Sequence, residues 1–424
     1  MGAGLLVQGL GAYVFLVVSA RALGPQRYSA LTVLWTLVFF AAPGFLFPIE
    51  QEVSRAVSAR RAMGVGGGPV IKRAAILGGG LAVALMVVSV AVRKPILEHL
   101  FDHQGLLLVA LVVALPAYAA IHLSRGALSG SERFVAYGSV LGLEGAVRVV
   151  ASVILVVAGV HSAGAFGLLV ALGPAVAVAL VLSRQRNLLE PGPEAPWSEL
   201  SEALGWLLLG AVLAQAFVNA SVPLVKILAP DNQKEIAGQF QAGLIISRVP
   251  LFLFQAVQAA LLPKLAGLAA KGKIADFRTG LRRLVIVVVA VGVLATLGAW
   301  VVGPFALRTL FGAKFNQLGH ADLGYLALGG AAFMLSTALS QALIALKGYA
   351  RVAVGWFVAI VVFGAVVALL NGLLFRVEIA LVSGAIVSVV AMALQLRSQM
   401  RSGVPDTAGP LIEAVTPEHE IIEP

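Results

Sequence analysis

Residues 250–258, PLFLFQAVQ, repeat the pattern of residues 43–51, PGFLFPIEQ, and both stretches end a long apolar run. The shared pattern is P-x-F-L-F-x-x-x-Q, with Pro43 and Pro250 at its first position. Proline interrupts a membrane helix, and the freed backbone groups must then be satisfied by neighbouring helices or by a water-lined cavity. One such interruption in each half of the chain predicts a duplicated bundle whose matched, hinged helices surround a central site.

The composition predicts an all-α membrane protein. Hydrophobic residues make up 60% of the chain and charged residues 12%, whereas a soluble domain carries about 25% charged residues. We count about twelve apolar runs, each long enough to cross a bilayer as a helix and too unbroken for a membrane β-barrel. The runs lie near residues 2–20, 29–49, 74–92, 106–123, 134–160, 165–182, 203–228, 239–262, 284–306, 323–346, 352–370 and 379–396.

The duplication extends beyond the proline motif. Residues 128–133, LSGSER, match residues 346–351, LKGYAR, as L-x-G-x-x-R, and each stretch precedes the fifth run of its half. Six runs per half is an even number, so both halves should face the same way, as in parallel transporter repeats. We therefore predict an N-terminal six-helix lobe over 1–182, a cytoplasmic linker over 183–202, a C-terminal six-helix lobe over 203–396 and a disordered acidic tail over 397–424.

Charge and missing residue types exclude several classes of protein. The net charge of +10 comes from Lys and Arg that gather in alternate loops, so we expect membrane lipids and no nucleic acid as partners, with both termini in the cytoplasm. The chain has no cysteine, which excludes disulfides and thiol chemistry. No phosphate-binding loop of the G-x-x-x-x-G-K-[ST] type is present. We expect no metal, no cofactor, no catalytic residue and no enzymatic activity.

Four ionisable residues fall inside apolar runs: Glu144, Arg148, Lys226 and Arg248. Such residues are costly at membrane depth and usually face an interior. Glu144 and Arg148 are four residues apart on one helical face, so they can form an ion pair. Either this pair satisfies itself and locks helix packing, or the substrate competes with Glu144 for Arg148.

Arg248 precedes the break at Pro250. There it either snorkels to the interface or pairs with a backbone carbonyl, or it binds an anion through two parallel hydrogen bonds. Lys226 lies near the outer end of its run, where it either snorkels to the interface or binds substrate. Arg55, on the inner extension of the second run, is either a solvated interfacial charge or reaches the mouth of a cavity. The candidate substrate-binding residues are therefore Arg248, Arg148, Arg55, Glu144 and Lys226. Three cations and one carboxylate would leave the interior positive, which suits an anionic substrate. Asp102 and His103 are expected to be surface residues.

A family resemblance agrees with this chemistry. Residues 21–28, RALGPQRY, resemble the R-x-L-G-x-x-x-Y-G signature of polysaccharide flippases in the multidrug/oligosaccharidyl-lipid/polysaccharide (MOP) exporter superfamily, with Ser29 in place of the final glycine. Residues 50–55, EQEVSR, look like the segment that follows it there. Residues 247–250, SRVP, are similar to the eighth helix of the lipid II flippases, in which an arginine at the position of Arg248 lines the cationic cavity that receives lipid pyrophosphate.

The resemblance implies a flippase of the bacterial cytoplasmic membrane. It would move a polyprenyl-(pyro)phosphate-linked sugar or oligosaccharide by alternating access, with Arg248 on the phosphate and Arg148 and Arg55 assisting. An H⁺ or Na⁺ gradient, or the membrane potential, would supply energy, and envelope-biosynthesis proteins would be partners.

Three alternatives stay open at this point. A MATE-like multidrug/cation antiporter would need an excess of buried carboxylates, and the sequence offers Glu144 alone. A non-transporting scaffold for envelope enzymes would use the acidic tail. A membrane glycosyltransferase would need acidic catalytic residues in a loop or soluble domain, and the longest loops contain no such cluster.

Overall fold

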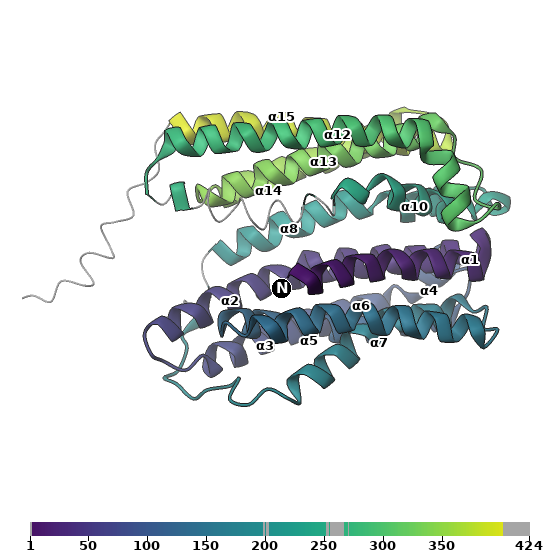
Figure 1. Cartoon of the computed structure of the whole chain (residues 1–424). Helices are drawn as coiled ribbons and strands as arrows, with labels where there is room; N and C mark the ends of the chain where they lie inside the picture. Colours follow the sequence, from purple (N-terminus) through teal and green to yellow (C-terminus); the bar gives the residue numbers. More distant parts are fainter. Residues whose placement is uncertain are drawn as a thin grey trace, which may run out of the picture.

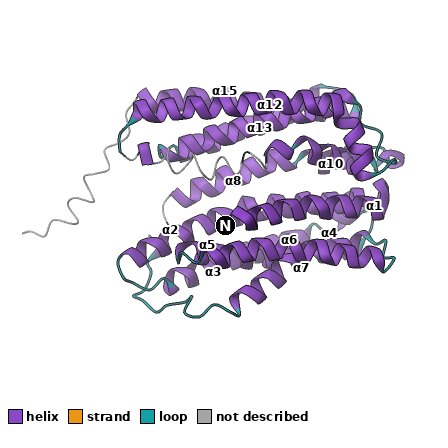
Figure 2. Ribbon diagram, in the orientation of Figure 1, coloured by secondary structure: helices purple, strands orange, loops and turns teal. Residues whose placement is uncertain are grey.

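The structure, a computed structural model, describes residues 2–197, 200, 203–251, 254, 267–269 and 271–401, and these residues contain helices and no strand (Figure 2). The acidic tail predicted after residue 397 lies outside these residues from residue 402 onward. Nine described helices are long and apolar enough to cross a membrane, or ten if one bent pair is a single span. Each predicted run coincides with a helix as far as the structure describes it, so the predicted fold class is confirmed.

The first two runs form one hairpin at the start of the chain. Helix α1 spans Gly2–Ala41 and reverses at Gly24, whose φ of 68° is a conformation that glycine adopts without steric cost. The rings of Phe15 and Trp35 stack with their centroids 5.7 Å apart, whereas a straight helix would separate these residues by about 30 Å. Pro25 then starts the returning helix, where its missing N–H is not needed.

The rest of the first half, residues 2–182, continues from this hairpin. The π-helical segment η1 and helix α2 lengthen the returning helix, and three long helices complete the half. The bounds are η1 Ala42–Leu46, α2 Phe47–Ala62, α3 Gly68–Ala91, α4 Arg93–Pro95, η2 Ile96–Leu100, α5 Gly105–Gly130, α6 Phe134–Val157 and α7 Ala163–Leu182.

The second half, residues 203–401, opens with a bent span. Helices α8, Ala203–Asn219, and α9, Ser221–Leu228, meet at a bend of 44°. Residues 203–228 were predicted as a single run, and this bend was not foreseen; Pro223 lies in the first turn of α9. The other bounds are η4 Asp231–Gln233, α10 Ile236–Ser247, α12 Ile274–Phe311, α13 His320–Ala345, α14 Tyr349–Leu369 and α15 Leu373–Arg401.

The two halves lie side by side with their helices roughly parallel (Figure 1). In the first half α5 packs on α2 and α7, and α6 packs on α1 and α7; in the second half α13 packs on α12 and α15, and α14 packs on α8 and α15. The halves meet where α1 and η1 contact α8, α9 and α10. The exact lobe limits, 1–182 and 203–396, stay a prediction.

The loops gather at two ends of the bundle. At one end, which we call the Gly24 end, Arg27 donates to the carbonyl of His161 across 2.9 Å. At the other, the linker end, Arg60 donates to the carbonyl of Pro193 across 2.8 Å and Arg133 to that of Asn187 across 3.0 Å. The two L-x-G-x-x-R stretches form the α5–α6 and α13–α14 turns, both at the linker end.

Candidate functional site

Glu144 and Arg148 form the centre of a buried network in the first half. Arg148 donates to Glu144 across 2.7 Å and to the hydroxyl of Tyr118 across 3.0 Å, and Gln8 donates to the other Glu144 oxygen across 2.6 Å. The guanidinium also lies 5.4 Å from the centre of the Trp35 ring. Glu144 and Arg148 are 2% and 1% exposed. Of the two interpretations that the sequence allowed, this geometry fits the locked pair.

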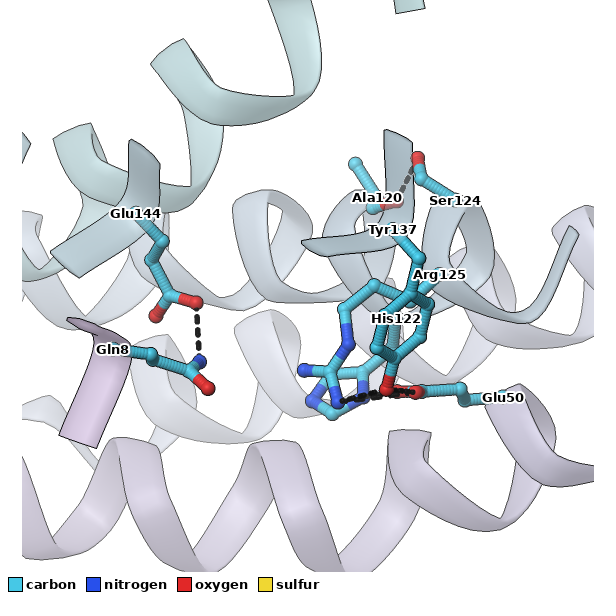
Figure 3. A network of polar contacts seen from close by, with 8 residues as sticks. All are labelled: Gln8, Glu50, Ala120, His122, Ser124, Arg125, Tyr137 and Glu144. Atoms are coloured by element: carbon cyan, nitrogen blue, oxygen red, sulfur yellow. Dashed lines mark hydrogen bonds and ion pairs between the residues drawn. The ribbon is translucent and has the colours of Figure 1, made fainter. Parts of the chain in front are cut away.

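A second buried network was not foreseen from the sequence. In what we call the Glu50 cluster, Glu50 of α2 lies 2.7 Å from His122 Nδ1 and 3.0 Å from Arg125 Nη2, both on α5 (Figure 3). The hydroxyl of Tyr137, on α6, donates to Glu50 across 3.2 Å. Arg125 lies within α5, which continues to Gly130, and its side chain is only 11% exposed.

Both networks share helix α5. Tyr118, His122 and Arg125 are spaced by four and three residues, so they lie along one face of that helix. The rings of Tyr118 and His122 are 6.4 Å apart, which brings the Glu144 network and the Glu50 cluster together. In these two networks, two carboxylates and two guanidinium groups compensate each other.

Lys226 joins the two halves. It lies on α9, fully buried, and donates to Asp102 across 2.8 Å and to the Ser29 hydroxyl across 2.7 Å. Both partners belong to the first half. The prediction that Lys226 snorkels to the interface was therefore wrong. Asp102 and His103 were predicted at the surface: the Asp102 side chain is 30% exposed and pairs with this lysine, and His103 is exposed. Asp102 reaches this lysine from a tight turn in which its own φ is 48°.

Other contacts close the same end of the molecule. The Arg21 guanidinium donates to the carbonyl of Leu310 across 2.7 Å, and the rings of Tyr28 and Phe315 meet edge to face at 5.8 Å. Gly238 of α10 packs so closely on α1 that an added Cβ would lie 2.7 Å from the carbonyl oxygen of Pro25. The halves are thus held together at the Gly24 end by polar, aromatic and backbone contacts.

Arg248 lies where two interrupted helices meet. It is the residue that follows α10, and it donates from Nη2 to the carbonyl of Val218, near the end of α8, across 2.7 Å. It also interacts electrostatically with Tyr13 of α1. The 12 residues of α10 span about 18 Å, which puts the guanidinium near the middle of the bundle's length.

The charge of Arg248 is not neutralised within the described part of the chain. No carboxylate among those residues pairs with it. Arg148 has Glu144, and Lys226 has Asp102. Arg55 is half exposed at the linker end and pairs with Glu52 at 2.5 Å. The structure therefore keeps Arg248, Lys226 and Arg55 apart and brings only Glu144 and Arg148 together.

The two prolines of the repeated motif lie in or just after irregular helical backbone. Pro43 is in the π-helical segment η1, and Pro250 comes two residues after Arg248. Gly44 of η1 faces α8, where an added Cβ would lie 3.5 Å from the Cα of Val212. The motif of the second half continues through residues 255–258, which lie outside the described residues.

Buried carboxylates are more numerous than the sequence indicated. Besides Glu144, the residues Glu50, Glu52 and Glu378 are each less than 5% exposed. Glu378, in the first turns of α15, interacts with the carboxyl group of Asp322 on α13. The statement that Glu144 alone was available was therefore wrong. Among the described residues, no three His, Asp or Glu side chains are grouped in a way that could hold a metal ion.

Comparison with known sequences gives relatives without a described activity. No family model matches the chain. An uncharacterized protein of Mycobacterium tuberculosis is 27% identical over 407 residues, covering 92% of this chain and 89% of the relative. A second uncharacterized protein of the same organism is 26% identical over 390 residues, covering 89% and 86%.

Solved structures identify the fold. An inward-facing multidrug resistance MATE family transporter of the MOP superfamily matches with a TM-score of 0.74 at 14% identity, over 93% of this chain and 96% of that one. A Vibrio cholerae MATE transporter gives 0.70 at 15% identity, over 94% and 95%. An outward-facing MATE family transporter gives 0.67 at 14% identity, over 95% and 94%. The chain therefore has the fold of MATE transporters.

Proposed function

We propose that this protein is a flippase that moves a polyprenyl-(pyro)phosphate-linked sugar or oligosaccharide across the bacterial cytoplasmic membrane. The observation that carries the proposal is Arg248, a guanidinium at mid-depth between the halves whose hydrogen-bond acceptor is a neutral carbonyl. Arg248 is partly buried, and a cation at membrane depth without a carboxylate partner is costly, so such a residue marks a place for an anion. A phosphate would replace the Val218 carbonyl and accept two parallel hydrogen bonds from Arg248.

The access cycle follows from the contacts between the halves. In the described state the Gly24 end is held by Lys226, Asp102 and Ser29. Basic residues concentrate at the linker end, which by the positive-inside rule is cytoplasmic, and both termini are then cytoplasmic too. The headgroup would enter from that side, and the Lys226 contacts would have to break before it leaves. The higher TM-score with the inward-facing than with the outward-facing transporter supports this order.

The other predicted residues have supporting roles in this scheme and do not hold the phosphate at mid-depth. Arg148 keeps α5 and α6 in place through Glu144 and Tyr118, and Arg55 receives the headgroup at the cytoplasmic mouth. Pro43 and Pro250 supply the bends about which the halves rock. The lipid tail stays in the bilayer while the saccharide passes between the halves, and an H⁺ or Na⁺ gradient or the membrane potential drives the cycle. Envelope-biosynthesis proteins remain proposed partners.

A reconstituted flipping assay tests the proposal. The purified protein in liposomes should translocate a fluorescent polyprenyl-pyrophosphate saccharide, measured as the fraction of probe that becomes accessible to a membrane-impermeant quencher. Arg248→Ala should reduce the rate at least tenfold, and Arg248→Lys should be intermediate because an ammonium cannot make the bidentate contact. Arg308→Ala, an exposed arginine at the Gly24 end, should leave the rate unchanged. Equal rates for wild type and Arg248→Ala would contradict the proposal.

A MATE-like multidrug/cation antiporter is the second candidate. The observation in its favour is the set of buried carboxylates, with Glu50 and Glu144 in the core of the first half and Glu378 in the second. The same liposomes decide between the two candidates. Efflux of a cationic dye driven by a pH or sodium gradient, abolished in Glu144→Gln and unaffected in Arg248→Ala, would support the antiporter.

A further inference from the structure

The first half contains an apolar cavity that the transport scheme does not use. Its volume is about 300 Å³, and it lies between α3, α5 and the η1–α2 segment. Small residues form much of its wall, including Ala74, Gly78 and Ala82 on α3 and Ala119 on α5. A Cβ added at Gly78 would meet one atom within 4 Å, Ile49 Cδ1 at 3.9 Å, and a Cβ added at Gly79 would meet none, so the wall has room for larger groups at both positions.

The cavity is long and opens toward the surrounding bilayer. Its wall on α3 runs from Ala74 to Met86, which corresponds to about 18 Å along the helix axis. This length begins near the linker end and reaches toward mid-membrane. Val83, on the same wall, is 58% exposed, so the cavity can be entered from the side that faces lipid. These dimensions suit one hydrocarbon chain lying parallel to the helices.

The polar groups lie toward the linker end. His122 is the one ionisable residue in the wall, and it is 6% exposed. Its Nδ1 is held by Glu50 at 2.7 Å, and among the described residues no hydrogen-bond partner is recorded for Nε2. Beyond this end, the first turns of α3 carry the exposed Lys72 and the adjacent Arg73, whose guanidinium lies 5.1 Å from the centre of the Trp197 ring. Basic side chains at the headgroup level attract anionic lipids.

We propose that this cavity, the α3–α5 groove, binds one acyl chain of an anionic phospholipid from the leaflet at the linker end. The chain would fill the space beside Gly78 and Gly79, and the phosphate would lie near Lys72 and Arg73. Membrane phospholipid is the occupant because the groove opens sideways to the bilayer, where acyl chains are abundant. The proposal does not rest on flipping, because a resident lipid would be detected whether or not the protein transports anything.

Photo-crosslinking tests the site in detergent-solubilised full-length protein. A phosphatidylglycerol with a diazirine in one acyl chain should label peptides of α3 and α5 in a saturable way. Gly78→Leu and Gly79→Leu, which fill the groove, should each lower this labelling at least fivefold. Gly80→Leu is the matched control. Gly80 is exposed on the same helix and lies outside the groove, and a Cβ added there would meet no atom within 4 Å.

Competition identifies the occupant. Unlabelled phosphatidylglycerol should displace the probe at a several-fold lower concentration than phosphatidylcholine does, and Lys72→Ala should reduce that preference. Labelling that is not saturable, or that is equal in all three glycine variants, would mean ordinary contact with annular lipid and would overturn the proposal. Displacement by a polyprenyl phosphate at lower concentrations than by phosphatidylglycerol would also overturn it, because the occupant would then be an isoprenoid carrier.

Discussion

Arginines at membrane depth differ here in whether their charge is compensated. Arg148 and Arg125 each face a glutamate and a tyrosine hydroxyl, so they belong to closed networks that hold helices together. Arg248 has a backbone carbonyl instead. An arginine that is paired with a glutamate helps to specify which helices pack together. An arginine without a carboxylate partner is available to bind an anionic ligand. The proposed substrate site therefore depends on Arg248 more than on any other arginine.

The Glu50 cluster should be essential for stability. Glu50→Gln leaves the Arg125 guanidinium buried without a negative partner, and breaking a buried ion pair in this way costs about 3–5 kcal/mol. We expect a large fall in the melting temperature of the detergent-solubilised protein. Glu132→Gln is the matched control, because its ion pair with Arg61 is exposed and is worth about 0–1 kcal/mol. Equal melting temperatures for the two variants would show that the cluster does not stabilise the fold.

At the scale of helices, close approach depends on glycine. In α1 and α6, Gly11 and Gly145 face each other, and a Cβ added at Gly145 would lie 2.8 Å from the Val7 carbonyl oxygen. Small residues allow such contact between membrane helices, where packing replaces the hydrophobic effect as the driving force. The α1–α6 contact also positions Gln8 against Glu144.

A larger side chain at this contact between α1 and α6 should destabilise the first half. Gly145→Val must push α1 away from α6, and overpacking of this kind costs about 1–3 kcal/mol. Gly142→Val, on the same helix with no atom within 4 Å of an added Cβ, should be nearly neutral. Melting temperatures of both variants check the expectation. A Gly145→Val protein as stable as Gly142→Val would mean that the helices separate without cost.

Spacing along the chain predicted contacts within helices better than contacts between them. Glu144 and Arg148 could be paired from the sequence because residues four apart share a helix face. Glu50 with Arg125, and Lys226 with Asp102, join helices distant in sequence, and no periodicity states which helices become neighbours. The long apolar runs could be located from the sequence for the same reason, because length and hydrophobicity are local properties.

At the scale of the whole molecule, the Lys226 contacts hold the Gly24 end closed. Lys226→Met removes the charge that binds Asp102 and Ser29, so this end should open more often. Because the chain has no cysteine, spin labels can be attached through Arg93→Cys and Arg308→Cys, one in each half. Pulsed electron paramagnetic resonance should then show a larger long-distance population in Lys226→Met than in the parent.

A control separates this effect from a general loss of charge at the same end. Lys234 pairs with Asp231 at 2.7 Å within the second half, so Lys234→Met should leave the distance distribution unchanged. A distribution that is identical in Lys226→Met and the parent would mean that the aromatic and backbone contacts alone close the Gly24 end.

The most direct measurement is an electron cryomicroscopy structure of the protein bound to a polyprenyl-pyrophosphate saccharide. We expect phosphate density within about 3 Å of the Arg248 guanidinium, with the hydrogen bond from Arg248 to the Val218 carbonyl broken. A headgroup bound elsewhere, with Arg248 still donating to Val218, would contradict the proposed role of Arg248.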